Sequence, residues 1–175
     1  MSRPGEGKPA VTIRRARTSD VRGIRALVDT YTADRRLLSK ATVTLYEAVQ
    51  EFWVAVEPES QRVVGCGALH VMWEDLAEIR TVAVDPSCRG RKIGHQIVQA
   101  LLDVARELGV ARVFCLTFET KFFGSFGFAE IDGAPVPHAV YEQLLRSYDE
   151  GVAEFLDLER VKPNTLGNTR MLLHL

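Results

Sequence analysis

The sequence lacks long apolar runs and carries almost no net charge. None of its 175 residues belongs to an uninterrupted apolar stretch of about 18 residues, and residues 1–10 contain no hydrophobic signal-peptide segment. The 22 basic and 23 acidic residues give a net charge of −1, which argues against a nucleic-acid backbone or an anionic membrane as the main partner. We therefore expect a cytoplasmic protein that binds neither nucleic acid nor membrane.

Cysteine is also scarce. Cys66, Cys88 and Cys115 are odd in number and widely spaced, and two of them fall in apolar segments. This pattern is typical of buried thiols in a reducing compartment, and it contains no spacing that would suit zinc ligands. We expect no disulfide and no metal site.

The length is typical of one compact unit. A chain of this size buries roughly 70% of its unfolded surface and needs no metal or disulfide for stability. We predict a flexible N-terminal tail over residues 1–10 and a single domain over residues 11–175.

The most informative segment runs from Leu76 to Leu108. Ile79–Val84 is rich in β-branched residues and predicts a strand that ends at Asp85 and Pro86. Apolar residues then recur every three to four positions over 93–108, which predicts a helix that Gly109 terminates in the left-handed conformation. The intervening loop and first helical turn contain Arg89, Gly90, Arg91, Lys92 and Gly94.

This strand, loop and helix favour a phosphate. The first N–H groups of a helix lack partners and carry the positive end of its dipole, and here cations and glycines surround them. An ordinary basic turn would explain the same pattern equally well. The common phosphate loops do not fit, because no G-x-x-x-x-G-K-[ST] occurs and the G-x-G at Gly65 and Gly67 lies inside an apolar run.

The segment resembles the core of the GNAT superfamily of N-acetyltransferases, whose loop reads [QR]-x-x-G-x-[GA] and binds the pyrophosphate of acetyl-CoA. Arg89 opens this pattern, Gly94 closes it, and Lys92 replaces the middle glycine. The resemblance implies acetyl-CoA as co-substrate. It also implies cofactor contacts from Val82, Val84, Arg89, Gly90, Arg91, Lys92, Ile93, Gly94, His95, Phe122 and Phe123.

The resemblance covers nearly the whole chain and implies an α/β (α+β) GNAT fold, with a mixed, mostly antiparallel twisted sheet of about six to seven strands flanked by helices. Gly127 and Phe128 match the family's late Gly-Phe pair. Outside the central segment we expect a first strand, a helix capped by Thr18 or Ser19, helices over 43–51, 121–126 and 139–148, and strands over 52–56, 63–72, 112–117, from 128 and over 171–175.

Glu78 stands where catalysts of this family place a general base. An amine attacks a thioester only when neutral, so a partly buried carboxylate with a raised pKa suits this role. A solvent-facing glutamate is the ordinary alternative, and Glu119 is the reserve candidate. Many members also place a proton-donating Tyr four residues before Gly-Phe, where this chain has Phe123.

A closer resemblance is to the short, kinase-free N-acetylglutamate synthases of actinobacteria. It rests on the stretches VTLYEAVQEFWVA, GCGALHV, EIRTVAVDP and VKPNTLGN. It implies acetyl transfer to the α-amino group of L-glutamate or L-glutamine, the first step of arginine biosynthesis. Because the acceptor carries carboxylates, Lys40, Arg80 and Arg170 are candidate cations, and Thr117 is a further candidate contact.

Other functions stay open on the sequence. The acceptor could be a protein lysine or N-terminus, although that acceptor would favour an acidic groove. The chain could also be a non-catalytic acetyl-CoA-binding regulator, because Lys92 and Phe123 replace family residues. Exposed sheet edges in this fold often pair, so a homodimer is one expected assembly.

Overall fold

A seven-stranded sheet forms the centre of the molecule in the computed structural model, which describes residues 10–32 and 41–175. The strand order is β1-β2-β3-β4-β5-β7-β6, with β4 and β5 parallel and every other neighbouring pair antiparallel. This confirms the predicted mixed, mostly antiparallel sheet. The strands are β1 (Thr12–Arg15), β2 (Phe52–Val56), β3 (Val63–Trp73), β4 (Leu76–Val84), β5 (Arg112–Thr117), β6 (Ala129–Glu130) and β7 (Thr169–His174).

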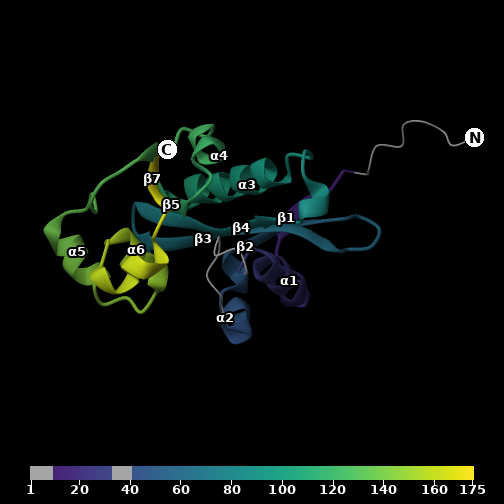
Figure 1. The fold of residues 1–175 in the computed structure, drawn as a ribbon, viewed down its shortest axis with the longest axis horizontal. Helices are drawn as coiled ribbons and strands as arrows, with labels where there is room; N and C mark the ends of the chain where they lie inside the picture. The colour runs from purple at the N-terminus through teal and green to yellow at the C-terminus, as the bar shows by residue number, and fades with distance from the viewer. Residues whose placement is uncertain (1–9, 33–40) are drawn as a thin grey trace, which may run out of the picture.

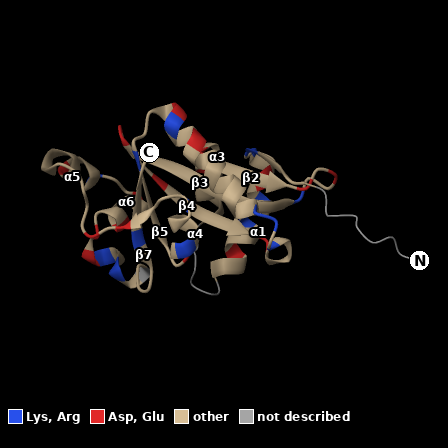
Figure 2. Ribbon diagram, turned by 90° about the horizontal axis from the view of Figure 1, so that it is seen from above, with Lys and Arg blue, Asp and Glu red and all other residues tan. Residues whose placement is uncertain are grey.

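Helices cover both faces of the sheet. Figure 1 shows α3 and α4 over one face and α1, α2 and α6 over the other. Figure 2 shows both signs of charge along α3, in keeping with the small net charge. In the described part of the chain, no helix is long and apolar enough to cross a membrane. The helices are α1 (Val21–Thr32), α2 (Thr42–Glu47), α3 (Ile93–Leu108), α4 (Thr120–Gly124), α5 (His138–Leu144) and α6 (Glu150–Phe155).

Several predicted boundaries need correction. Thr18 and Ser19 do not cap the first helix but lie inside a 3-10 turn (Thr18–Asp20) that leads into α1, and the Asp20 carboxylate of this turn accepts the Arg17 N–H at 2.7 Å. The helix predicted over 139–148 ends at Leu144, and α6 was not predicted as a separate helix. The segment 43–51 forms α2 followed by a 3-10 turn over Val49–Glu51. Residues 1–9 of the predicted tail lie outside the described residues.

Buried side chains gather in clusters on the two faces. Ile97 and Leu101 of α3 pack on one face as the helical periodicity predicts. On the other face, Ile24 belongs to a cluster under α1, whereas Phe114 and Phe155 meet edge to face under α6 with ring centroids 5.2 Å apart. The candidate site lies on this second face, between the α1 cluster and the α6 cluster.

A bulge in β4 reverses which residues face each side. Cys66 pairs with Ala83 but Ala68 pairs with Arg80, so β4 holds one extra residue, and Thr81 adopts a φ of 58°. Arg80 therefore faces α6, whereas beyond the bulge Val82 and Val84 pack against the α3 side. Strand β4 thus contributes residues to both faces of the sheet, Arg80 on the α6 side and Val82 and Val84 on the α3 side.

Strands β4 and β5 separate soon after they begin. They pair only from Leu76 to Glu78 and from Arg112 to Phe114. Beyond Glu78, no described strand pairs with this side of β4. This edge of β4 lies without a strand partner next to the predicted phosphate loop, and its Val84 carbonyl accepts from the Tyr31 hydroxyl instead.

Candidate active site

Glu78 is a buried carboxylate in the middle of the sheet. Its side chain is 4% exposed, and it lies opposite His70 in the β3–β4 register. Burial raises the pKa of Glu78 more than the neighbouring Arg80 lowers it, so the net shift is upward. Glu78 therefore has the burial and the proton affinity that a general base requires.

Arg80 joins Glu78 to a second carboxylate. Its Nη2 donates to Glu78 Oε2 at 2.8 Å and to Asp149 Oδ1 at 2.6 Å, and its Nη1 donates to Asp149 Oδ2 at 2.8 Å. Burial favours the neutral guanidinium, but the two carboxylates outweigh it, and the pKa of Arg80 is raised. The sequence assigned Arg80 to the acceptor's carboxylate; in the structure its guanidinium is already held by these two.

Asp149 sits at the N-terminus of α6 and also caps that helix. Its Oδ1 accepts the Val152 N–H at 3.1 Å. Burial tends to raise the pKa of Asp149, but the hydrogen bonds and charge of Arg80 lower it to about 2. Asp149 is thus ionised at neutral pH.

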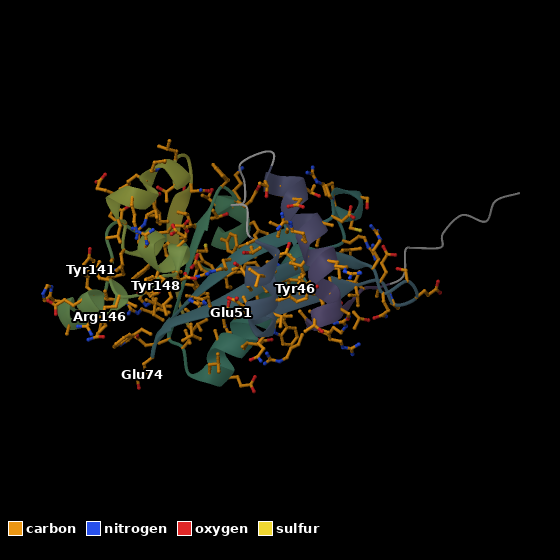
Figure 3. The ribbon with its side chains drawn as sticks, turned by 90° about the horizontal axis from the view of Figure 1, so that it is seen from below. Tyr46, Glu51, Glu74, Tyr141, Arg146 and Tyr148 are labelled. Atoms are coloured by element: carbon orange, nitrogen blue, oxygen red, sulfur yellow. The ribbon has the colours of Figure 1, made fainter. Side chains whose placement is uncertain are left out.

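His70 extends the cluster toward the surface. Its Nδ1 lies 2.6 Å from Glu51 Oε1, and its Nε2 lies 3.7 Å from Asp149 Oδ2. Figure 3 shows Glu51 between the α1 side and the α6 side of this face. Glu51, His70 and Asp149 were not predicted from the sequence. An aspartate before a short helix is an N-cap signal that could have identified Asp149.

Gly151 lets α6 approach this cluster. A Cβ at this position would collide with Glu78 Oε2 and with Arg80 Nη2, which it would meet at 2.5 Å. Only a residue without a side chain brings the start of α6 against both groups.

The predicted phosphate loop has the backbone geometry of an anion site. Gly90 and Lys92 both adopt left-handed conformations, with φ of 80° and 56°. Lys92 precedes α3 without a side-chain cap, so the first N–H groups of the helix remain for a ligand. Arg89 and Lys92 are exposed beside them. Ile93 is buried in the core and can offer only its backbone.

The predicted cofactor contacts of β4, α3 and α4 meet in one place. A Cβ at Gly94 would lie 3.5 Å from Phe122 and 3.6 Å from Val84. His95 stacks on Phe126 with ring centroids 4.5 Å apart. Phe123 points into the core instead, where it is 6% exposed and packs on Phe128. Of the two phenylalanines, Phe122 is therefore the one placed for a ligand.

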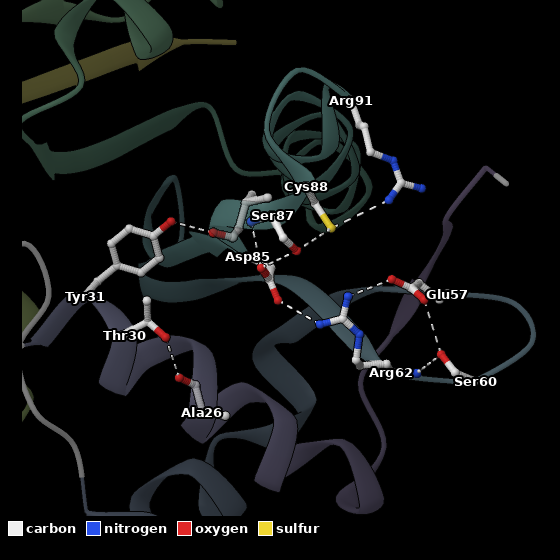
Figure 4. Close-up of polar contacts among 11 residues, drawn as sticks. Ala26, Thr30, Tyr31, Glu57, Ser60, Arg62, Asp85, Ser87, Cys88 and Arg91 are labelled. Carbon is white, nitrogen blue, oxygen red and sulfur yellow. Dashed lines mark hydrogen bonds and ion pairs between the residues drawn. The ribbon is translucent and has the colours of Figure 1, made fainter. Parts of the chain in front are cut away.

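Polar contacts hold the start of this loop (Figure 4). Arg62 donates to Asp85 at 2.9 Å and to Glu57 at 2.8 Å. Asp85 also accepts the Ser87 N–H at 2.9 Å, and the Tyr31 hydroxyl donates to the Val84 carbonyl. The β2–β3 hairpin and α1 thus fix the position of the loop.

The remaining predicted residues lie apart from the Glu78 cluster or outside the described chain. Thr117 is buried and its hydroxyl accepts the N–H of Glu119, whose own side chain is exposed. Arg170 donates to the carbonyls of Gly133, at 2.8 Å, and Phe155. Lys40 lies outside the described residues. Among the residues that are described, no three His, Cys, Asp or Glu side chains gather as a metal site.

Comparisons with known proteins agree with this geometry. The family model described as the acetyltransferase (GNAT) family matches residues 23–134. A Mycobacterium tuberculosis protein named amino-acid acetyltransferase is 64% identical over 98% of this chain and 97% of its own.

Solved structures match as well. One from Mycobacterium tuberculosis in complex with CoA and NLQ is 65% identical, covers 94% of this chain and 99% of its own, and superposes with a TM-score of 0.90. The N-acetylglutamate synthase from Neisseria gonorrhoeae, complexed with coenzyme A and N-acetyl-glutamate, shares the fold at 22% identity, with a TM-score of 0.76 over 97% of this chain and 36% of its own.

Proposed function

The chain belongs to the GNAT acetyltransferase family, and from this membership we infer that it transfers an acetyl group from acetyl-CoA to the α-amino group of an amino acid. The Mycobacterium tuberculosis relative, which matches almost the full length of both chains, supports an amino acid as acceptor. We propose L-glutamate or L-glutamine as that amino acid and the cytoplasm as the location. The free thiols of Cys66, Cys88 and Cys115 agree with a reducing compartment.

The residues present fit acetyl-CoA. The first N–H groups of α3 and the cations Arg89, Arg91 and Lys92 would hold the pyrophosphate. The edge of β4 beyond Glu78, which no described strand joins, would hold the extended amide-containing arm beside Val82, Val84 and Phe122. When bound, acetyl-CoA supplies a thioester whose carbonyl carbon an amine can attack.

The observation that carries the mechanism is the burial of Glu78 with its raised pKa. Glu78 takes a proton from the acceptor ammonium, directly or through water, and so frees the nitrogen lone pair. The new N–C bond then forms as the C–S bond breaks, the electron pair leaves with sulfur, and the nitrogen releases its second proton to the thiolate or to water. Phe123 cannot donate a proton to it, but a thiol with a pKa of about 8.5 leaves acceptably as a thiolate near neutrality.

The acceptor's carboxylates need cations near Glu78. Arg80 already donates to two carboxylates, which leaves one Nη1 N–H for the acceptor. Arg170 and Lys40 stay the other candidates. The Nε of Arg170 is buried and no described group accepts from it.

Replacing Glu78 tests this function. We expect Glu78→Gln to lower acetylation of glutamate and glutamine by about a hundredfold or more, while affinity for CoA, measured by calorimetry, stays within about twofold because the loop is untouched. Glu119→Gln removes the reserve candidate, an exposed carboxylate near β5, and we expect it to keep nearly full turnover. Equal losses in both variants, or none in Glu78→Gln, would reject Glu78 as the base.

A further inference from the structure

The carboxylate of Asp149 makes two kinds of contact. Oδ1 caps α6 at Val152 and also accepts from Arg80 Nη2 at 2.6 Å, whereas Oδ2 accepts from Arg80 Nη1 at 2.8 Å. A helix cap needs only one oxygen. The second oxygen and the negative charge interact with Arg80, so Asp149 does more than start the helix.

Arg80 passes this constraint to Glu78 through a single oxygen. Its Nε and Nη2 both donate to Glu78 Oε2, at 3.2 and 2.8 Å. Among the described residues, none donates to Oε1 of Glu78. One oxygen of the carboxylate is therefore fixed and the other is left to accept a proton. Because Asp149 holds both nitrogens of the guanidinium fork, Arg80 cannot rotate away from this position without losing two further bonds.

We propose that Asp149 is a positioning residue of the acetyl-transfer site: through Arg80 it fixes Oε2 of Glu78 and leaves Oε1 to take the proton of the acceptor amine. This inference rests on the proposed role of Glu78 as base. It also gives Arg80 a role other than the carboxylate ligand that the sequence suggested.

Titratable groups face Glu78 from each neighbouring element. Arg80 lies on the same strand, His70 on β3, Cys115 on β5 and Asp149 at the start of α6. Asp149 raises the pKa of Glu78, whereas Arg80 and His70 lower it. Glu51 stands behind His70 at 2.6 Å. Without the Asp149 charge, the remaining positive Arg80 would favour ionised Glu78, which would become a weaker base.

Asp149→Asn is the direct test. Asparagine caps helices as well as aspartate does, so α6 should still form, but the negative charge is lost. We expect the acidic limb of the kcat/KM profile against pH to move down by about one pH unit and kcat on the plateau to fall about tenfold. Glu150→Gln is the matched control, because it removes a neighbouring carboxylate that binds exposed Arg160 at 2.7 Å instead of Arg80. We expect its acidic limb to stay in place.

A measurement without turnover separates this inference from the proposed function. Carbon NMR titration of the Glu78 carboxyl, assigned by the signal that Glu78→Gln removes, should show a lower pKa in Asp149→Asn than in the unchanged protein. If the unchanged protein acetylates no amino acid, the proposed function fails while the titration still tests the Asp149–Arg80–Glu78 contact. An unmoved titration and an unmoved acidic limb would overturn the inference. Asp149→Ser, which also keeps the cap, repeats the test if the asparagine variant does not fold.

Discussion

At the scale of single residues, Lys92 shows how a departure from a family pattern is accommodated. The loop needs a left-handed backbone where the family has glycine, and Lys92 adopts it with φ of 56°. A residue with a Cβ pays about 1–2 kcal/mol for this conformation. Lysine in place of glycine at position 92 therefore lowers stability somewhat and puts an exposed ammonium next to the first turn of α3.

Lys92→Gly should stabilise the protein. Relief of the left-handed conformation outweighs the greater freedom of glycine in the unfolded chain, so we expect the free energy of unfolding in urea to rise by about 0.5 to 1 kcal/mol. Lys92→Ala is the control, because alanine keeps the Cβ and gains no relief. Equal stability of the two variants would show that backbone strain at this position is negligible.

Residue identity and local pattern were enough to predict some of the site. The loop from Arg89 and the buried cysteines were inferred from neighbours close in sequence, and Glu78 from the resemblance of its strand to the family's. The core position of Phe123 was not, because one aromatic pair on a short helix fits a ligand or a core equally well. Whether Glu78 and the loop residues act as proposed stays a prediction.

At the scale of elements, the clearest structural feature is the close approach of α3 to β3. A Cβ at Gly65 would lie 2.7 Å from Ile93, and one at Gly67 would lie 2.8 Å from Ile97. These glycines lie on the strand under the helix, so the G-x-G that failed as a dinucleotide motif serves packing. The approach places the N-terminus of α3 beside the unpaired part of β4.

Gly67→Ala should destabilise the protein by about 1–3 kcal/mol, because the added methyl group must displace Ile97 or shift the helix. Gly124→Ala is the matched control. A Cβ there meets nothing within 4 Å, and alanine favours the helix. Thermal or urea unfolding of both variants would test this, and similar stabilities would contradict the close approach.

Long periodic elements were predicted well and short ones were not. The sixteen residues of α3 carry a clear apolar stripe. The prediction for 139–148 ran too far because the apolar residues Leu145 and Tyr148 continue the helical pattern beyond Leu144. Leu145 is 48% exposed and Tyr148, labelled in Figure 3, is fully exposed. The six residues of α6 are too few for a periodic signal, so Asp149 and its role were missed with the helix.

At the scale of the whole molecule, the site is assembled from segments far apart in the chain. Glu51, His70, Glu78 and Asp149 come from four different elements and meet between two apolar clusters. Pairing of β3 with β4 brings the second and third together, but nothing local in the sequence brings Asp149 to them. A homodimer through a sheet edge stays a prediction.

The stability of the fold at low pH depends on carboxylates of this assembly and of the Arg14–Asp20 ion pair. The pKa of Asp149 is lowered to about 2, and the ion pair with Arg14 outweighs burial and lowers that of Asp20 as well. A lowered folded-state pKa gives stability that is present above the usual aspartate value and lost as pH falls through the folded one. We expect the free energy of unfolding to decline between about pH 4 and pH 2.

Asp149→Asn should flatten this decline by on the order of 1 to 2 kcal/mol, and Asp20→Asn should flatten it as well. Urea unfolding at several pH values measures the slope for each variant. Glu78 acts in the opposite direction, because its raised pKa favours the folded state at low pH and that contribution is lost as pH rises. A decline as steep in both asparagine variants as in the unchanged protein would show that these two carboxylates do not carry it.

The most direct test of the account is a competition for one acetyl group. Isotope-labelled acetyl-CoA would be mixed with the protein and equal amounts of glutamate, glutamine, a peptide with a free N-terminus and a lysine peptide, and mass spectrometry would identify the labelled products. We predict label on the α-amino group of glutamate or glutamine, and its loss with Glu78→Gln. Label found on the peptides, or on no acceptor while CoA still binds, would contradict the account.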